Sequence, residues 1–120
     1  MPPRLWKFRV NHILEAIESI DEYTTGMTFT EFQSNKLIIA CVKLNFIVIG
    51  EAARYIPPDV AARYPDLPIA DMRAMRNAVV HNYDNVRLVT LWETARNDLP
   101  PLIPILREIM DREVEVELTE

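Results

Sequence analysis

The chain has 120 residues, of which 49% are hydrophobic and 26% charged, a balance typical of one soluble domain with a real core. It contains only two glycines, too few for the turns of an all-β fold. The net charge of −5 does not exclude a nucleic-acid partner, because residues 108–120 carry six acidic side chains against one basic one, which leaves a balanced body. We expect a single domain over residues 1–112 and an acidic tail over residues 113–120.

The first predicted helix covers residues 4–23. Its apolar residues recur at three- and four-residue steps and form one stripe: Trp6, Val10, Ile13, Leu14, Ile17 and Ile20. Gly26 then suits a left-handed residue after the helix. The N-terminal segment lacks the continuous apolar stretch of a signal peptide, and the lone Cys41 suits a reducing compartment, so we expect a cytoplasmic protein.

The second predicted helix runs from Thr28 or Thr30 to Pro57, and Thr28 with Glu31 resembles a capping box. Residues 37–49 are apolar on nearly every side, although Lys43 interrupts them. This pattern predicts a central helix surrounded by others, with a buried strand as the competing interpretation. The run is too short to cross a bilayer, which needs about 20 apolar residues.

Prolines divide the second half of the chain into shorter pieces. Residues 57–67 predict a short helical turn, and a third helix begins at Pro68 and ends near residues 83–85. A fourth helix, over about residues 86–97, is bent or restarted by "DLPPLIP" and continues to about residue 112. The tail alternates with period two, and a strand, a frayed helix end and disorder all remain open for it. The whole predicts an all-α antiparallel bundle of four to five helices.

The third predicted helix contains "RNAVVHNY", which places Arg76, His81 and Tyr83 within eight residues. Arg76 and Tyr83 are seven residues apart and share a face, whereas His81 lies about 140° around the axis from Arg76. The three side chains line one pocket if the helix end distorts near His81, or if two subunits form the pocket. No phosphate-loop, dinucleotide or serine-hydrolase motif is present, and no spacing suggests metal ligands, so we expect no cofactor.

These three residue types suit phosphodiester cleavage without a metal. Histidine can take the proton from a ribose 2′-hydroxyl, and arginine can stabilise the charge that grows on the phosphate. The 2′-hydroxyl is the internal nucleophile, which restricts such a site to RNA. The competing interpretation is structural: the histidine interacts with the helix dipole, the tyrosine packs on the core, and Arg76 pairs with Asp71 or Asp84.

At these residues the sequence resembles a known family. The R-x-x-x-x-H-x-Y pattern is similar to that of HEPN-domain ribonucleases, specifically the HepT-like toxins. "LNFIVIGEAARYIP" resembles the family's central "IGEA" helix, "YPDLPIADMRAMRNAVVHNY" its region leading into the motif, and "VTLWETARNDLPPLIPIL" its closing helix. The resemblance covers roughly residues 5–110. One departure is Ala70, near which relatives commonly carry a tryptophan.

The resemblance implies a homodimeric toxin whose two motif helices face each other across a cleft and form a composite RNase site. It assigns catalysis to Arg76 and His81. It also implies an antitoxin, an MntA-like nucleotidyltransferase of a type VII-like pair, which attaches AMP to Tyr83. The alternatives are a catalytically silent HEPN subunit that serves a nucleotidyltransferase as partner or substrate, and a helical dimer in which the motif is a coincidence.

Three further residues are candidates for RNA binding or support of the site. Asn77 either orients His81 or binds phosphate, and otherwise faces solvent. Arg73, one turn before Arg76, adds positive potential for a phosphate backbone or lies on a solvated face. Glu51 either pairs with one of these arginines or is solvated.

Overall fold

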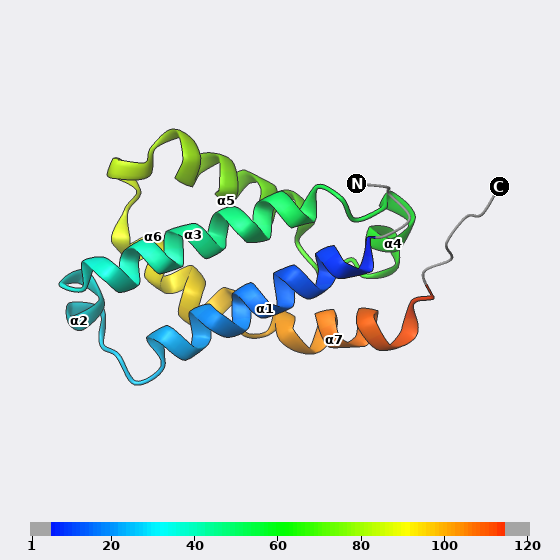
Figure 1. Cartoon of the computed structure of the whole chain (residues 1–120), viewed down its shortest axis with the longest axis horizontal. Helices are drawn as coiled ribbons and strands as arrows, with labels where there is room; N and C mark the ends of the chain where they lie inside the picture. Colours follow the sequence, from blue (N-terminus) through cyan, green and yellow to red (C-terminus); the bar gives the residue numbers. More distant parts are fainter. Residues whose placement is uncertain (1–5, 115–120) are drawn as a thin grey trace.

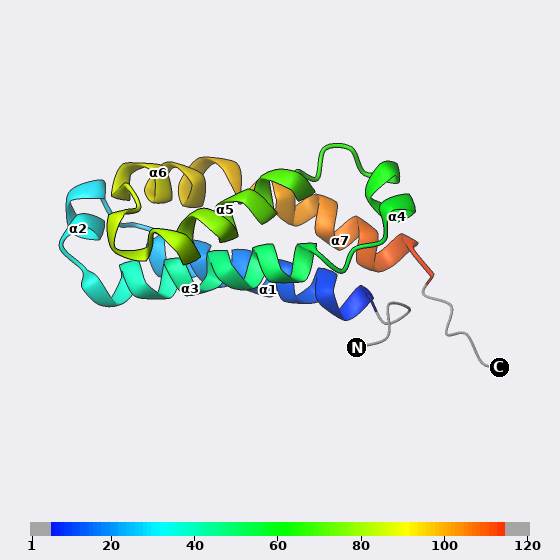
Figure 2. The same cartoon turned by 90° about the horizontal axis from the view of Figure 1, so that it is seen from above.

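The computed structural model describes residues 6–114, which form an all-α bundle, as predicted (Figure 1). The helices are α1 (Lys7–Thr24), α2 (Phe29–Gln33), α3 (Lys36–Ala53), α4 (Pro58–Arg63), α5 (Ile69–His81), α6 (Leu88–Glu93) and α7 (Leu102–Arg112). Two short elements join them: the 3-10 turn η2 (Tyr83–Asn85) and the π-helical segment η3 (Thr94–Asp98). The two views agree that α1 and α3 lie side by side, with α6 and α7 behind them (Figures 1 and 2).

The first helix and its ending follow the sequence pattern. All six residues of the predicted stripe are buried. Gly26 has a φ of 81°, in the left-handed region that glycine adopts without strain. Thr28 and Glu31 form the predicted capping box, because each accepts a hydrogen bond from the backbone N–H of the other, at 2.8 and 3.1 Å.

The prediction of one continuous helix from residue 28 or 30 to residue 57 is wrong. The chain leaves the helical path at Asn35, where φ is −107° and ψ is 91°. The Asn35 side chain accepts a hydrogen bond of 3.0 Å from the N–H of Ile38 and thereby caps the start of α3. An asparagine side chain can satisfy a free N–H at a helix start, so the break between α2 and α3 is stable.

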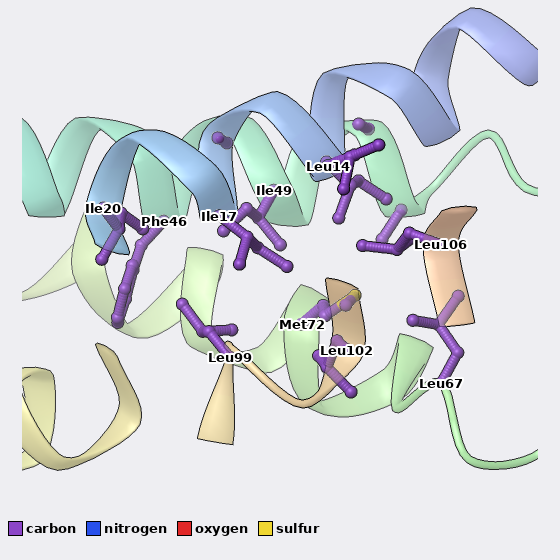
Figure 3. Close-up of a cluster of buried hydrophobic side chains, with 14 of the residues drawn as sticks. Leu14, Ile17, Ile20, Phe46, Ile49, Leu67, Met72, Leu99, Leu102 and Leu106 are labelled. Carbon is purple, nitrogen blue, oxygen red and sulfur yellow. The ribbon is translucent and has the colours of Figure 1, made fainter. Parts of the chain in front are cut away.

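The hydrophobic core lies where α1, α3, α5 and α7 meet. Figure 3 shows Ile17 from α1, Phe46 and Ile49 from α3, Met72 from α5 and Leu102 from α7 turned toward one another. These side chains are all buried. Each helix therefore contributes one apolar face to a single core, as the 3.6-residue periodicity requires.

The prediction that other helices surround α3 is also wrong. In Figure 2, α3 runs along an edge of the bundle, and no described helix covers its outer side. Leu37 is 72% exposed and Leu44 59% exposed. We call this stripe, spaced at three and four residues, the outer α3 face; it consists of Leu37, Ala40, Cys41, Leu44 and Val48. The sequence correctly marked these positions as apolar, but Leu37, Ala40 and Leu44 are exposed in the single chain, and Cys41 and Val48 are only partly buried.

The second half of the chain bends at the predicted place. Leu99 donates its N–H to the carbonyl of Thr94 at 3.0 Å, a five-residue step that defines the π-helical segment. Pro100 and Pro101 follow directly and have no N–H to continue the ladder. The chain therefore changes direction between α6 and α7, and Leu99 and Leu102 both reach the core.

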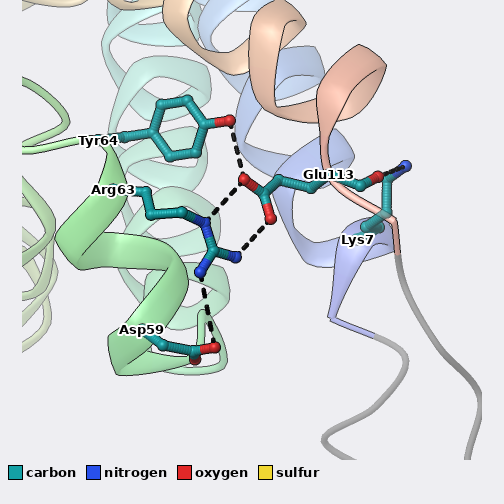
Figure 4. A network of polar contacts seen from close by, with 5 residues as sticks. All are labelled: Lys7, Asp59, Arg63, Tyr64 and Glu113. Carbon is teal, nitrogen blue, oxygen red and sulfur yellow. Dashed lines mark hydrogen bonds and ion pairs between the residues drawn. The ribbon is translucent and has the colours of Figure 1, made fainter.

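A polar network joins the end of α7 to α4 and α1 (Figure 4). Glu113 accepts hydrogen bonds from Arg63 Nε at 3.0 Å and from the Tyr64 hydroxyl at 2.9 Å, and its carbonyl accepts one from Lys7 Nζ at 2.7 Å. The hydrogen bonds from Arg63 lower the pKa of Glu113 below its ordinary value of 4.5, because they stabilise the charged carboxylate. Residues 115–120, on which most of the prediction for the acidic tail rests, lie outside the described residues. No described helix combines the length and apolar character needed to cross a membrane.

Candidate functional site

Helix α5, which carries the predicted motif, lies directly against α3. The two helices come very close to each other at Gly50. A Cβ atom added there would lie 2.1 Å from Arg76 Cβ and 2.7 Å from the Met72 carbonyl oxygen. Carbon atoms in ordinary contact are about 3.5–4.0 Å apart, so α5 can occupy this position only because residue 50 has no side chain.

Arg76 emerges from this crossing beside Glu51. Its Nε lies 3.7 Å from Glu51 Oε1, close enough for an ion pair but too far for a good hydrogen bond. The same Nε is buried and has no hydrogen-bond partner in the described part of the chain. One terminal nitrogen, Nη1, donates to Asn77 Oδ1 at 3.0 Å. The guanidinium is thus oriented by two neighbours and retains unused donors for an anion.

Tyr83 lies at the other end of the motif and contacts Lys43 of α3. Lys43 Nζ donates a hydrogen bond of 2.6 Å to the Tyr83 carbonyl and lies 4.3 Å from the centre of the Tyr83 ring. Tyr83 nevertheless remains 43% exposed. Lys43 therefore fixes the backbone and one side of the ring, and leaves part of the tyrosine open to solvent.

The two contacts have a regular spacing. Arg76 meets Gly50, and Tyr83, seven residues later, meets Lys43, seven residues earlier on α3. Seven residues are close to two helical turns, so both contacts lie on one side of α3, with the two segments running in opposite directions. Arg76 and Tyr83 thus both contact α3, although Tyr83 belongs to η2 and not to the regular helix on which the shared face was predicted.

His81 is the last residue of α5 and is exposed. The next residue, Asn82, has a φ of −132° and a ψ of 42°, so the regular helix stops there before η2 begins. The helix end therefore does distort near His81, one of the two conditions set out above. The His81 side chain forms no hydrogen bond or ion pair with another residue between 6 and 114.

The supporting candidates divide into two groups. Glu51 pairs with Arg54 at 2.9 Å and approaches Arg76, and Asn77 contacts Arg76. Arg73 is exposed and has no ion-pair partner among the described residues. One prediction was that Asn77 orients His81. In the structure Asn77 instead accepts a hydrogen bond from Arg76. The pairing of Arg76 with Asp71 or Asp84 is not found.

One cavity lies beside the motif helix and another lies between α1 and α3, and neither is lined by Arg76, His81 or Tyr83. One, of about 570 Å³, lies between α5 and the η3–α7 segment, with Met72, Met75 and Leu99 in its wall. The other, of about 460 Å³, lies between α1 and α3, and Glu51 and His12 line it. The motif thus lies on an open surface of the single chain. The described residues contain no group of three or more His, Cys, Asp or Glu side chains placed to hold a metal ion.

Two residues of this site were not identified as candidates from the sequence. In the sequence, Lys43 only interrupted an apolar run, and Gly50 was noted only as part of the segment that resembles the family's central helix. A charged residue in a buried apolar stretch and a glycine inside a helix both lower the stability of the fold. Their presence was therefore the sequence signal that these two residues have a specific role. Their partners, however, are 40 and 26 residues away along the chain, and only the fold brings them together.

Comparison with known proteins identifies the family of the chain. Residues 13–109 match the family described as Ribonuclease HepT-like. "Putative RNase MJ1216" of Methanocaldococcus jannaschii is 37% identical over 102 residues, which cover 85% of this chain and 84% of that protein. "Probable ribonuclease HepT" of Thermococcus cleftensis is 35% identical over 99 residues, covering 82% and 90%. No solved structure matches the chain. The chain belongs to the HepT-like ribonuclease family, and its bundle is HEPN-like.

Proposed function

We propose that this protein is a metal-independent endoribonuclease toxin that cleaves RNA at a cleft between two copies of the motif helix. The observation that carries the proposal is the state of Arg76. Its guanidinium is held at the open edge of the α3–α5 pair, with a buried Nε that has no hydrogen-bond partner in the described chain. A phosphate group would supply acceptors for the terminal nitrogens of this guanidinium, of which Nη1 already donates to Asn77.

The proposed chemistry needs only the motif residues and the RNA. His81 takes the proton from a 2′-hydroxyl, and the 2′-oxygen attacks the adjacent phosphorus. The bond to the 5′-oxygen breaks, a protonated imidazole returns a proton to that oxygen, and the products are a 2′,3′-cyclic phosphate and a 5′-hydroxyl. Arg76 stabilises the additional negative charge on the phosphate oxygens in the transition state.

A homodimer is the expected form of the active protein. The outer α3 face presents exposed leucines directly beside the motif helix, and an apolar stripe of this kind marks an interaction surface. Pairing this face with its own copy would bring two α5 helices to the same side of the interface. Arg76 and His81 lie on different faces of α5. In a cleft between two copies, Arg76 of one copy and His81 of the other could therefore both reach the RNA.

The proposed regulator is a nucleotidyltransferase antitoxin that transfers AMP to Tyr83. The exposure of Tyr83 supports this assignment, because a modifying enzyme must reach the phenol oxygen. An added AMP places a bulky, negatively charged group beside Arg76, where it competes with the RNA phosphate. Both events are placed in the cytoplasm, where RNA and such a partner meet.

The decisive experiment compares the two histidines of the chain. Purified protein should cleave RNA in the presence of EDTA, and His81→Ala should reduce the rate by about 100-fold or more, the usual size of a lost proton-transfer group. His12→Ala is the matched control, because His12 is also exposed and lies on α1, away from the motif. Equal cleavage by the wild type and the His81→Ala variant would refute the proposal.

One observation favours the alternative of a catalytically silent subunit. His81 has no orienting hydrogen bond from the described chain, whereas Tyr83 is both exposed and fixed. If the tyrosine is the working residue, co-expression with the nucleotidyltransferase should add the mass of AMP to the wild type and not to Tyr83→Phe. Such addition, without any RNA cleavage by the unmodified protein, would decide for this alternative.

A further inference from the structure

Lys43 is the charged residue that the fold buries. It is 8% exposed, and among residues 6–114 the other buried polar side chain is the neutral Thr24. No carboxylate of the described chain lies within ion-pair distance of its Nζ. A buried ammonium without an acidic partner is costly, and an apolar side chain of the same length would fill this space without that cost.

The hydrogen bond and the ring contact of the Lys43 ammonium are both with Tyr83, at the end of the motif. Its ammonium donates to the Tyr83 carbonyl at 2.6 Å and lies over the Tyr83 ring at 4.3 Å from the centre. The Tyr83 carbonyl belongs to η2, just beyond the end of α5, where carbonyl oxygens lack helical partners and attract a cation. Lys43 thus performs the part of a C-terminal cap, supplied by a different helix.

This cap acts where the chain leaves the regular helix. Between His81 and Tyr83 the chain leaves the α-helix through Asn82, and the described helices give η2 few contacts apart from its own neighbours. Without the ammonium, the Tyr83 carbonyl would need a hydrogen bond from water, and the Tyr83 ring would lose its cation–π contact. A short segment of this kind then samples other conformations, and the positions of both His81 and Tyr83 vary with it.

We propose that Lys43 is a positioning residue that holds Tyr83 in the orientation in which it is modified and holds His81 at the cleft. This inference rests on the proposed function. In the modification step, the Tyr83 oxygen forms a bond to the α-phosphorus of a nucleoside triphosphate bound by the partner enzyme. Pyrophosphate leaves, and the phenolic proton passes to water. Lys43 takes no part in these bond changes and acts through the placement of Tyr83.

The test replaces Lys43 with methionine, which keeps the length and removes the charge and the donor. Lys36→Met is the matched control, because Lys36 is exposed at the start of the same helix. We expect Lys43→Met to shift the Tm by no more than about 5 °C. The rates of AMP transfer to Tyr83 and of RNA cleavage should each fall by roughly tenfold or more, the penalty for a misplaced reacting group.

Two further measurements separate positioning from a general structural role. Amide hydrogen exchange over residues 82–87 should be roughly 10-fold to 100-fold faster in Lys43→Met, the factor that corresponds to the loss of one hydrogen bond to a charged group. Lys43→Arg keeps the cation and the donor, so it should restore both the exchange rate and the reaction rates toward those of the wild type. If Lys43→Met does not fold, Lys43→Gln, a smaller neutral donor, replaces it in the same comparisons.

The outcomes are distinguishable from failure of the proposed function. A wild type that neither cleaves RNA nor accepts AMP contradicts the proposed function, and hydrogen exchange then decides alone whether Lys43 positions Tyr83. A wild type that is active, together with Lys43→Met of equal activity and equal exchange, contradicts the role of Lys43. Loss of activity in Lys43→Arg as severe as in Lys43→Met, with normal exchange, also contradicts it.

Discussion

Substitution of Gly50 by alanine tests whether the close approach of α3 and α5 positions the site. In an ordinary helix interior, this change stabilises by about 1 kcal/mol, because alanine loses less backbone entropy on folding. Here the added Cβ would lie 2.1 Å from Arg76 Cβ and 2.7 Å from a backbone oxygen of α5. To reach normal contact, the helices must separate by roughly 1.5 Å. We therefore expect the sign of the effect to reverse.

The magnitude follows from two opposing contributions. Overpacking of a close contact costs about 1–3 kcal/mol, and a clash with backbone belongs at the upper end because it cannot be relieved by a rotamer change. After the helix-propensity gain, a net loss of about 2 kcal/mol remains, which corresponds to a fall in Tm of roughly 5–10 °C. Since Arg76 moves with α5, RNA cleavage should fall by about 100-fold at a temperature where the variant is still folded.

Thermal unfolding followed by circular dichroism measures the loss of stability. RNA cleavage, assayed roughly 20 °C below the Tm of the variant, measures the loss of activity separately. Gly26→Ala is the control, because Gly26 has open space around it but a φ of 81°, so alanine there costs about 1–2 kcal/mol through backbone strain. The control should lose stability and keep activity. A Gly50→Ala protein with wild-type Tm and wild-type cleavage would refute the argument that this crossing positions Arg76.

Two further predictions concern the surface and the C-terminal network. Leu37→Asp on the outer α3 face should weaken self-association by roughly 100-fold, because each copy loses a leucine that the dimer would bury. Val114 is also an exposed apolar residue, and Val114→Asp should leave self-association unchanged. Analytical ultracentrifugation measures both association constants, and equal values for the two variants would contradict the proposed dimer face. Glu113→Gln should lower the Tm at pH 7. A carboxyl whose folded pKa is lowered contributes stability above its unfolded pKa, so this Tm difference should shrink as the pH falls below 4.5 and on through the lowered folded pKa. A Tm difference between Glu113→Gln and wild type that stays constant from pH 7 to about pH 3 would show that the Arg63 hydrogen bonds do not stabilise the fold.

Local chemistry explains which features were predictable from the sequence. The capping box at Thr28 and the left-handed Gly26 depend on residues within three positions of each other, so the sequence carries all the information. The break at Asn35 was equally local, since asparagine is among the preferred residues at a helix start, but the long apolar run that follows concealed it. In this case the capping preference of a single asparagine determined the structure, and the more conspicuous apolar run did not.

The status of α3 needed information that the sequence does not contain. Apolar residues on all sides of a helix indicate that each side is covered, but they do not say by what. Core packing covers the inner side, whereas Leu37 and Leu44 on the outer α3 face are exposed in the single chain. In the proposed homodimer the second copy covers these leucines, and the error then lay in assigning all of the predicted burial to one chain.

The spacing of the motif also acquires a physical reason from the fold. Seven residues separate Arg76 from Tyr83 because two turns separate Gly50 from Lys43, and a regular helix would then carry the intervening His81 away from that line. Because α5 ends at His81, the chain leaves the helical path only at the next residue, Asn82, before Tyr83 contacts Lys43 of α3. An extra residue between Arg76 and Tyr83 would turn Tyr83 by about 100° and break the contact with Lys43. The motif and the glycine and lysine of α3 therefore constrain one another, and a change in either spacing should disrupt the site even when every individual residue is retained.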